Sequence, residues 1–165
     1  GIDYAHGSGF YVGTWMSNYD TASQYENDIY GGYTMEIGSV GMDFGTILYR
    51  YPVGPTQSDL QEVYANFAIK DFEFGVALTI SKEGSPADEN DLYYWGSWST
   101  DLKKGLSLGV LAGEYDYDAA ATEDYNHYQV SLTKGDFIFA LDKNDSTGDA
   151  GDLRMSISWS QSFDL

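Results

Sequence analysis

The sequence predicts an all-β protein: an antiparallel, up-and-down β-barrel of the transmembrane type, formed by residues 1–165 as one domain. Three observations lead to this prediction. Strand-length segments alternate apolar with small polar residues, the connections alternate between short and long, and aromatic residues gather at the strand ends. Composition agrees, because 19 Gly and 15 Tyr with only 3 Pro are typical of strands and turns. No apolar run of about 18 residues exists, so no transmembrane helix is expected.

Alternation along the chain defines about eleven strands, most of which reach the 9–11 residues that cross a bilayer at a tilt. The predicted spans are 1–6, 10–18, 27–37, 42–51, 61–69, 72–81, 92–101, 106–115, 126–134, 137–143 and 153–163.

The apolar face recurs from strand to strand. The second, fourth and sixth strands carry on it Phe10, Val12, Thr14 and Met16, then Met42, Phe44, Thr46 and Leu48, then Phe72, Phe74, Val76, Leu78 and Ile80. The eighth and last carry Leu106, Leu108, Val110 and Ala112, then Leu153, Met155, Ile157 and Trp159. The opposite face is mostly Gly, Ser, Ala and Thr. A soluble sandwich would turn the apolar face to a core, whereas a membrane barrel turns it to lipid and lines its lumen with the small polar face.

Connection lengths favour the membrane barrel. Short connections are 7–9, 38–41, 70–71, 103–105 and 135–136, and long ones are 19–26, 52–60, 82–91, 116–125 and 144–152. Strict alternation is the layout of an outer-membrane barrel with tight periplasmic turns and longer external loops.

Aromatic residues form two predicted bands, as expected for the two interfaces of a membrane. Phe10, Phe44, Phe72, Phe137 and Phe163 lie near short turns. The long-loop end carries Tyr49, Tyr51, Tyr93, Tyr94, Trp95, Tyr115, Tyr117, Tyr125 and Tyr128.

An odd strand count raises a closure problem. Strands 1–6 and 153–163 both run toward the short-turn side, whereas bacterial barrels usually have an even number of strands. Open edges are not tolerated in hydrocarbon. We therefore expect twelve strands in the complete barrel, with one further strand that precedes residue 1 or comes from another chain.

The opening segment Gly1 to Trp15 resembles the G-D-Y-x-H-x-S-G-F-Y-x-G-x-W stretch of the Gcw_chp family of uncharacterised proteobacterial secreted proteins. Further similar stretches are 26–33, 49–52, 62–64, 105–109 and 160–163. The resemblance implies an outer-membrane-like barrel with a strand before this segment, and it implies no known activity. The chain departs from barrel termini that stop at the aromatic residue, because Asp164 and Leu165 follow Phe163.

Charged residues on the lumen phase are the candidate selectivity residues. Asp28, Glu62, Asp142 and Arg154 are expected near the long loops, and Glu36, Asp43, Glu73 and Asp101 near the short turns. A mostly acidic lumen favours cations. The alternative is that these charges are solvated at the rims, and that Trp15, Tyr30, Tyr64 and Trp95 fill the lumen.

Acidic loops offer a weak calcium candidate. Carboxylates at short spacing can hold Ca²⁺, and the fullest set is Asp142, Asp145, Asp149 and Asp152. The run lacks the terminal bidentate Glu of a calcium loop, so a solvated acidic loop is the alternative. Otherwise no cofactor is expected.

Other functional classes find little support. With 8 basic and 26 acidic residues, a formal charge of −18 argues against nucleic acid as a partner. The two His residues, His6 and His127, are expected at opposite ends, and no motif points to catalysis.

The sequence therefore predicts a small passive pore for cations or small polar solutes in a bacterial outer membrane, with lipid and lipopolysaccharide as partners. The alternative is a structural or adhesive barrel with a filled lumen, which assembles with copies of itself through its edges or acidic loops. An extracellular fibre subunit is a further reading.

Overall fold

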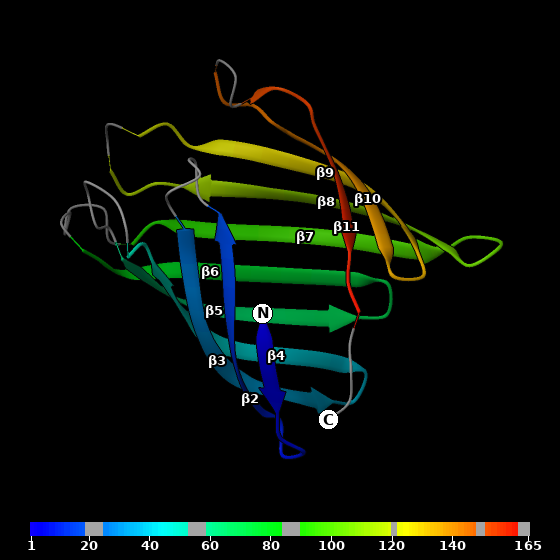
Figure 1. The fold of residues 1–165 in the computed structure, drawn as a ribbon, viewed down its shortest axis with the longest axis horizontal. Coiled ribbons are helices and arrows are strands. Elements are labelled where there is room, and N and C mark those ends of the chain that lie inside the picture. Colours follow the sequence, from blue (N-terminus) through cyan, green and yellow to red (C-terminus); the bar gives the residue numbers. More distant parts are fainter. Residues whose placement is uncertain (19–24, 53–58, 84–89, 120–121, 148–150, 162–165) are drawn as a thin grey trace.

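The structure is a computed structural model, and it describes residues 1–18, 25–52, 59–83, 90–119, 122–147 and 151–161. Eleven β-strands make up the fold (Figure 1). They are β1 (Ile2–Ala5), β2 (Phe10–Asn18), β3 (Tyr25–Ile37), β4 (Val40–Arg50), β5 (Leu60–Ile69), β6 (Phe72–Lys82), β7 (Leu92–Asp101), β8 (Leu106–Asp116), β9 (Tyr125–Lys134), β10 (Phe137–Asn144) and β11 (Arg154–Trp159). Each strand overlaps one of the predicted spans, so the all-β prediction is confirmed.

All eleven strands belong to one sheet, in which each strand pairs antiparallel with its neighbours in sequence. The up-and-down topology is therefore confirmed. The sheet is not closed, because β1 and β11 are its two edges and do not pair with each other in the described residues. Figure 1 shows the sheet curling, so that β1, β2 and β11 lie in front of β4 to β7. No helix in the described ranges is long and apolar enough to cross a membrane.

Two-residue turns join several strands at one end of the sheet. Lys70 in the β5–β6 turn has a φ of 55°, and Gly135 in the β9–β10 turn has a φ of 56°. Tight hairpins need positive φ because their backbone twist then matches that of the flanking strands. These turns fix the register of the hairpins that they close.

One irregularity shifts the register between β5 and β6. Gln61 pairs with Ser81 while Glu62 pairs with Thr79, which leaves Ile80 as an extra residue in β6. A bulge of this kind re-aims the side chains around it. Here it brings Thr79 opposite Glu62 on one face of the sheet.

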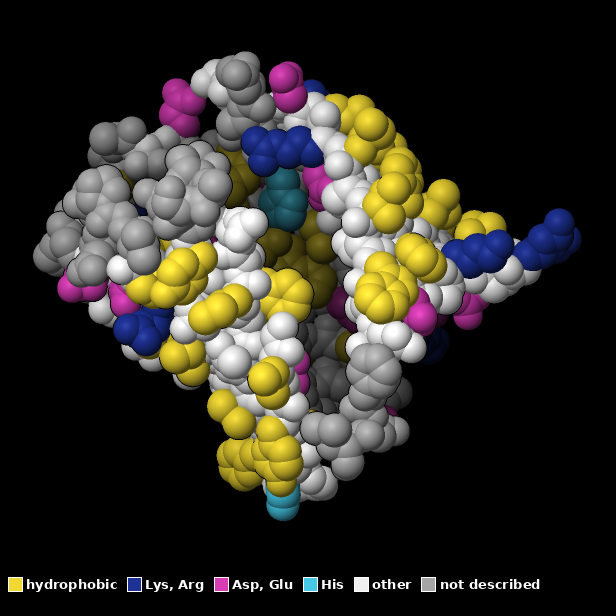
Figure 2. All heavy atoms as spheres, viewed as in Figure 1, with side chains coloured by type: hydrophobic (Ala, Val, Ile, Leu, Met, Phe, Trp, Pro, Cys, Tyr) yellow, Lys and Arg dark blue, Asp and Glu magenta, His cyan; other side chains and the backbone are white. Residues whose placement is uncertain are grey.

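The sheet has a small, polar and aromatic concave face and an apolar convex face, called here the inner and outer faces. Ala140 is the single buried hydrophobic residue in the described part of the chain, and it keeps 5% of its surface exposed. The buried polar residues there are Asp28, Thr79 and Asp91. Figure 2 shows the hydrophobic side chains on the outside, with a hollow between the two front edges. The described part thus lacks the apolar core of a soluble sandwich.

The two edge strands are more exposed than the rest of the sheet. Every residue of β1 and β11 is exposed, unlike any other strand. Ile2 and Ile157 expose 77% and 76% of their surface, whereas Val76 on the outer face of a central strand exposes 38%. Each edge residue has a neighbouring strand on one side only.

Candidate functional site: the acidic inner face

The eight charged residues predicted for the lumen lie on one face of the sheet. Side chains alternate between the two faces along each strand, and residues that pair across strands lie on the same face. The register therefore shows which residues of β3 to β11 lie on the inner face. The residues are Asp28 and Glu36 on β3, Asp43 on β4, Glu62 on β5, Glu73 on β6, Asp101 on β7, Asp142 on β10 and Arg154 on β11. Seven of these eight residues are acidic, so the inner face carries a strongly negative potential.

Large aromatic residues of the inner face lie over glycines of the neighbouring strand. Tyr30 stands directly opposite Gly13, and Tyr64 directly opposite Gly45. The same pairing joins Tyr11 with Gly32, Trp95 with Gly75 and His127 with Gly113. A Cβ atom on any of these glycines would collide with the ring opposite. Each ring therefore lies against the sheet at a glycine, because any other residue would place a Cβ atom where the ring is.

A hydrogen-bond network crosses the inner face near its middle. The Tyr11 hydroxyl donates to Asp43 Oδ1 at 2.7 Å and also contacts the Tyr64 hydroxyl. The Asn66 side-chain amide donates to Asp43 Oδ2 at 3.4 Å. Both oxygens of Asp43 are thus engaged by side chains from β2 and β5. The network therefore fixes the Asp43 carboxylate in position on the inner face.

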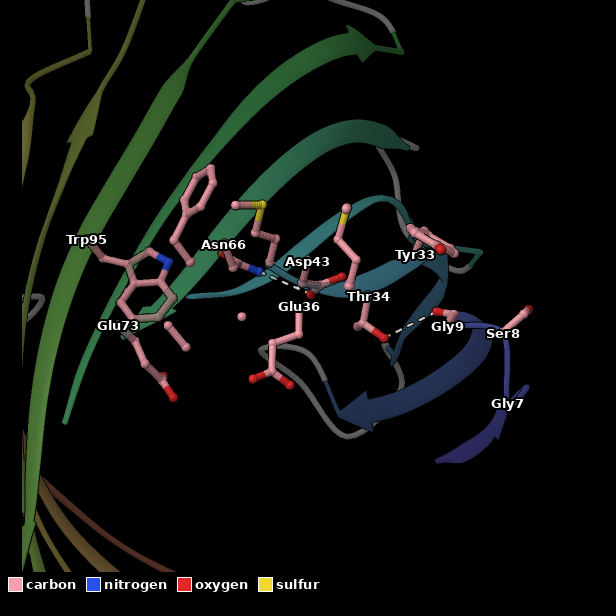
Figure 3. A pocket seen from close by; sticks show the side chains of 15 residues that line it. Gly7, Ser8, Gly9, Tyr33, Thr34, Glu36, Asp43, Asn66, Glu73 and Trp95 are labelled. Atoms are coloured by element: carbon pink, nitrogen blue, oxygen red, sulfur yellow. Dashed lines mark hydrogen bonds between the residues drawn. The ribbon is translucent and has the colours of Figure 1, made fainter. Parts of the chain in front are cut away.

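A wide hollow of about 940 Å³ opens at the short-turn end, and we call it the turn-end hollow. Figure 3 shows Glu36, Asp43 and Glu73 around it, and Asn66 and Trp95 also line it. The first turn forms part of its rim through Gly9, whose carbonyl accepts hydrogen bonds from Thr34. Three carboxylates therefore surround the entrance at this end.

A second hollow of about 380 Å³ lies on the inner face of β3 to β8. We call it the tyrosine chamber, because it is lined by Tyr30, Tyr49, Tyr64, Tyr93 and Tyr115. Its carboxylates are Asp43 and Glu62. Asp43, Asn66 and Trp95 line both hollows, so the two hollows adjoin at these residues.

Glu62 is the carboxylate at the centre of the chamber wall. It accepts hydrogen bonds from the Tyr49 hydroxyl at 3.3 Å and from the Thr79 hydroxyl at 3.4 Å. The bulge in β6 places Thr79 for this contact. Both bonds are long, so the carboxylate retains capacity for a further donor.

Stacked aromatic rings line the inner face toward the long loops. The ring centroids of Tyr93 and Tyr115 are 4.3 Å apart, and those of Tyr115 and Tyr125 are 5.1 Å apart. Tyr93 also stacks on His127 at 5.6 Å, and its hydroxyl contacts His127 Nε2 at 2.9 Å. Tyr117, just after β8, stacks on Tyr115 at 5.9 Å. Burial raises the pKa of the Tyr117 phenol, so this end of the stack stays neutral at ordinary pH.

The aromatic residues predicted to form a band at the long-loop end do not all lie on one face of the sheet. Tyr49, Tyr93, Tyr115 and Tyr125 lie on the inner face, because their strand positions share the phase of Glu62 and His127. Tyr94 and Tyr128 do lie on the outer face, where they expose 41% and 52% of their surface. Position near a strand end does not decide the face, which is set by the phase of alternation.

A family comparison bears on these features. Residues 1–138 match the model of the Gcw_chp family, described as a bacterial protein of unknown function. The chain belongs to the Gcw_chp family. No curated protein and no solved structure matches it. The family match covers β1 to the first residues of β10, and therefore includes both hollows of this Gcw_chp chain.

The predicted calcium residues of this Gcw_chp chain do not converge in the described residues. Asp142 faces inward and accepts a hydrogen bond from Gln129 Nε2 at 2.7 Å. Asp145 accepts hydrogen bonds from the Asn126 side chain and backbone, at 2.9 and 2.7 Å. Asp149 lies outside the described residues, and Asp152 lines a hollow of about 90 Å³ with Asp142 and Arg154. Within the described ranges, no group of three or more His, Cys, Asp or Glu side chains could hold a metal ion.

Sequence reasoning placed the inner-face charges but missed Tyr11 as a partner of Asp43. The two residues lie on β2 and β4, with β3 between them. The small inner-face residue Gly32 on β3 lets the Tyr11 ring reach across. A signal for this contact exists in the sequence: an aromatic residue and a glycine at matching phase in adjacent strands.

Proposed function

We propose that this Gcw_chp protein is an outer-membrane β-barrel whose acidic interior conducts cations passively. One observation carries the proposal: the distribution of side chains is inverted relative to a soluble sandwich. Apolar residues cover the outer face, and carboxylates line two adjoining hollows on the inner face. Lipid would cover the outer face, and the adjoining hollows would form the path for solutes.

Membrane insertion is tested by the orientation of two tryptophans in β7. Trp98 pairs with Phe72 and Val110 on the outer face, whereas Trp95 lies over Gly75 on the inner face. Single-tryptophan variants, with the other three tryptophans changed to Phe, are refolded into vesicles with brominated lipid tails. We expect strong quenching of Trp98 and little quenching of Trp95. Equal quenching of both, or of neither, contradicts a lipid-facing outer surface and favours a soluble extracellular protein.

Closure of the barrel by a further strand is part of the proposal. β1 and β11 run in the same direction, because an odd number of antiparallel strands separates the first from the last. One strand antiparallel to both, from this polypeptide or from another chain, would pair with each edge and complete twelve strands. An engineered Asp3→Cys and Ser156→Cys pair tests direct contact. A disulfide that forms readily between these cysteines would show that the two edges pair directly, and would contradict the twelfth strand.

Asp43 is the proposed main determinant of cation preference. It lies where the two hollows meet, and it is held by Tyr11 and Asn66. In planar bilayers with a KCl gradient, the reversal potential should report a preference for K⁺ over Cl⁻. Asp43→Asn should reduce this preference, whereas Asp136→Asn, in the β9–β10 turn, should leave it unchanged. Absence of conductance from folded protein would refute the pore.

A structural barrel with a filled interior is the second candidate. The contact between Tyr11 and Tyr64 and the stack of Tyr93, Tyr115 and Tyr125 favour it, because these rings occupy the interior. The same bilayer recordings separate the two candidates. A filled barrel would be quenched at Trp98 by brominated lipid but would pass no current.

A further inference from the structure

The tyrosine chamber combines two features that together recognise a particular class of ligand. Its wall holds the aromatic rings of Tyr30, Tyr49, Tyr64 and Trp95 together with the Glu62 and Asp43 carboxylates. No Lys or Arg is among the residues that line the chamber in the described part of the chain. Its volume of about 380 Å³ suits a small organic molecule.

Aromatic faces and carboxylates attract the same kind of charge. The face of an aromatic ring is negative, so a quaternary or primary ammonium group is attracted to it, most strongly where water is excluded. Glu62 adds a carboxylate to the wall, and the hydrogen bonds that it accepts from Tyr49 and Thr79 are both longer than 3.2 Å. An ammonium ion could therefore approach the carboxylate without displacing strong bonds.

Asp28 supplies an independent observation beside the chamber. It stands directly opposite Tyr49 in the β3–β4 ladder and exposes only 7% of its surface. Its Oδ1 atom is buried and has no hydrogen-bond partner among the described residues. Asp28 does not itself line the chamber, but Tyr49 opposite it does, so a buried acidic group lies next to the chamber wall.

From these observations we propose that the tyrosine chamber is a binding site for a small organic ammonium ion. The site deepens the proposed function and rests on it, because the ligand would reach the chamber through the cation path. The rings of Tyr49 and Tyr64 surround the onium group, and Glu62 neutralises its charge. The connection at Asp43 and Asn66 to the turn-end hollow provides the entrance.

The test is binding of choline to the folded full chain in detergent, measured by isothermal titration calorimetry at constant ionic strength. The neutral isostere 3,3-dimethylbutan-1-ol has nearly the same shape without the charge. We expect choline to bind at least about tenfold more tightly than this alcohol, because attraction by rings and carboxylates requires the cation. Equal binding of the two, or no binding of choline, overturns the inference.

Variants assign the binding to the chamber. Glu62→Gln and Tyr49→Leu should each weaken choline binding roughly tenfold, whereas Tyr49→Phe keeps the ring and should bind within about threefold of the unchanged protein. Asp136→Asn is the control, because Asp136 lies in the β9–β10 turn and lines neither hollow. A loss of binding in Asp136→Asn as large as that in Glu62→Gln would place the site elsewhere and overturn the inference.

These experiments can refute the pore and the ammonium site independently of each other. Choline binding by a protein that passes no current would refute the pore and keep the ammonium site. Current without choline binding would keep the pore and refute the ammonium site.

Discussion

Gly45 offers a sharp test of the packing between glycines and aromatic rings on the inner face. In Gly45→Ala, the added Cβ would overlap the ring of Tyr64 and would lie 2.8 Å from the backbone oxygen of Gly31. The ring can move only by leaving the wall and losing its contact with the Tyr11 hydroxyl. The backbone oxygen cannot move without bending β3.

Gly41 is the matched control on the same strand and the same face. In Gly41→Ala, the nearest atom to the new Cβ is the Cβ of Ala68 at 3.6 Å, which is an ordinary van der Waals contact. Both substitutions remove backbone freedom from the unfolded chain, which stabilises by roughly 0.5–1 kcal/mol. Overpacking costs about 1–3 kcal/mol and applies only to Gly45.

The free energy of unfolding should therefore be lower for Gly45→Ala than for Gly41→Ala by about 1–3 kcal/mol. Urea titration of the protein folded in detergent micelles measures this difference. With a slope near 2 kcal/mol per molar urea, the two midpoints should differ by roughly 0.5–1.5 M. Equal midpoints would refute the reasoning, because they would show that the Tyr64 ring does not need the space above Gly45.

Three further predictions concern the turns, the Asp43 network and the long-loop end. Lys70 has a φ of 55°, so Lys70→Gly should raise the free energy of unfolding by roughly 0.5–1 kcal/mol in urea titration. Lys103 does not have a positive φ, so Lys103→Gly should not stabilise the fold. Tyr11→Phe removes the donor to Asp43 and should lower the free energy of unfolding by about 1 kcal/mol in the same titration. Hydrogen bonds from the Asn126 side chain and backbone lower the pKa of Asp145 in the folded protein. The unchanged protein should therefore be more stable than Asp145→Ala above the unfolded pKa of about 3.9, and this advantage should be lost as the pH falls through the folded pKa. Thermal unfolding of both proteins between pH 7 and pH 2 tests this, and an advantage that does not decrease over this range would contradict it.

The strands and their faces could be predicted because alternation is a local property. The phase that puts Phe72, Phe74 and Val76 outward also puts Glu73 and Gly75 inward, and this follows from two-residue periodicity alone. The hairpin turns were equally local, since each is marked by residues that accept positive φ or by lysines and aspartates between two alternating runs.

The contacts that shape the interior could not be predicted from the sequence in this way. The Tyr11 hydroxyl meets Asp43 two strands away, which depends on strand tilt and register. The contact of Glu62 with Thr79 depends on the bulge at Ile80, which alternation does not reveal. The stack of Tyr93, Tyr115 and Tyr125 is a further case, because a position near a strand end does not reveal which rings from neighbouring strands stack on one another.

The pairing of inner-face rings with glycines determines how far these rings project from the sheet. A ring that lies flat against the inner face projects only a short distance from the sheet, so it leaves most of the space in front of the sheet open. A larger residue at the glycine would turn the ring inward and narrow the interior, and a smaller residue in place of the ring would widen it. One sheet of fixed strand number and register can therefore form inner-face hollows of different width, with each step set by a single pair of facing residues.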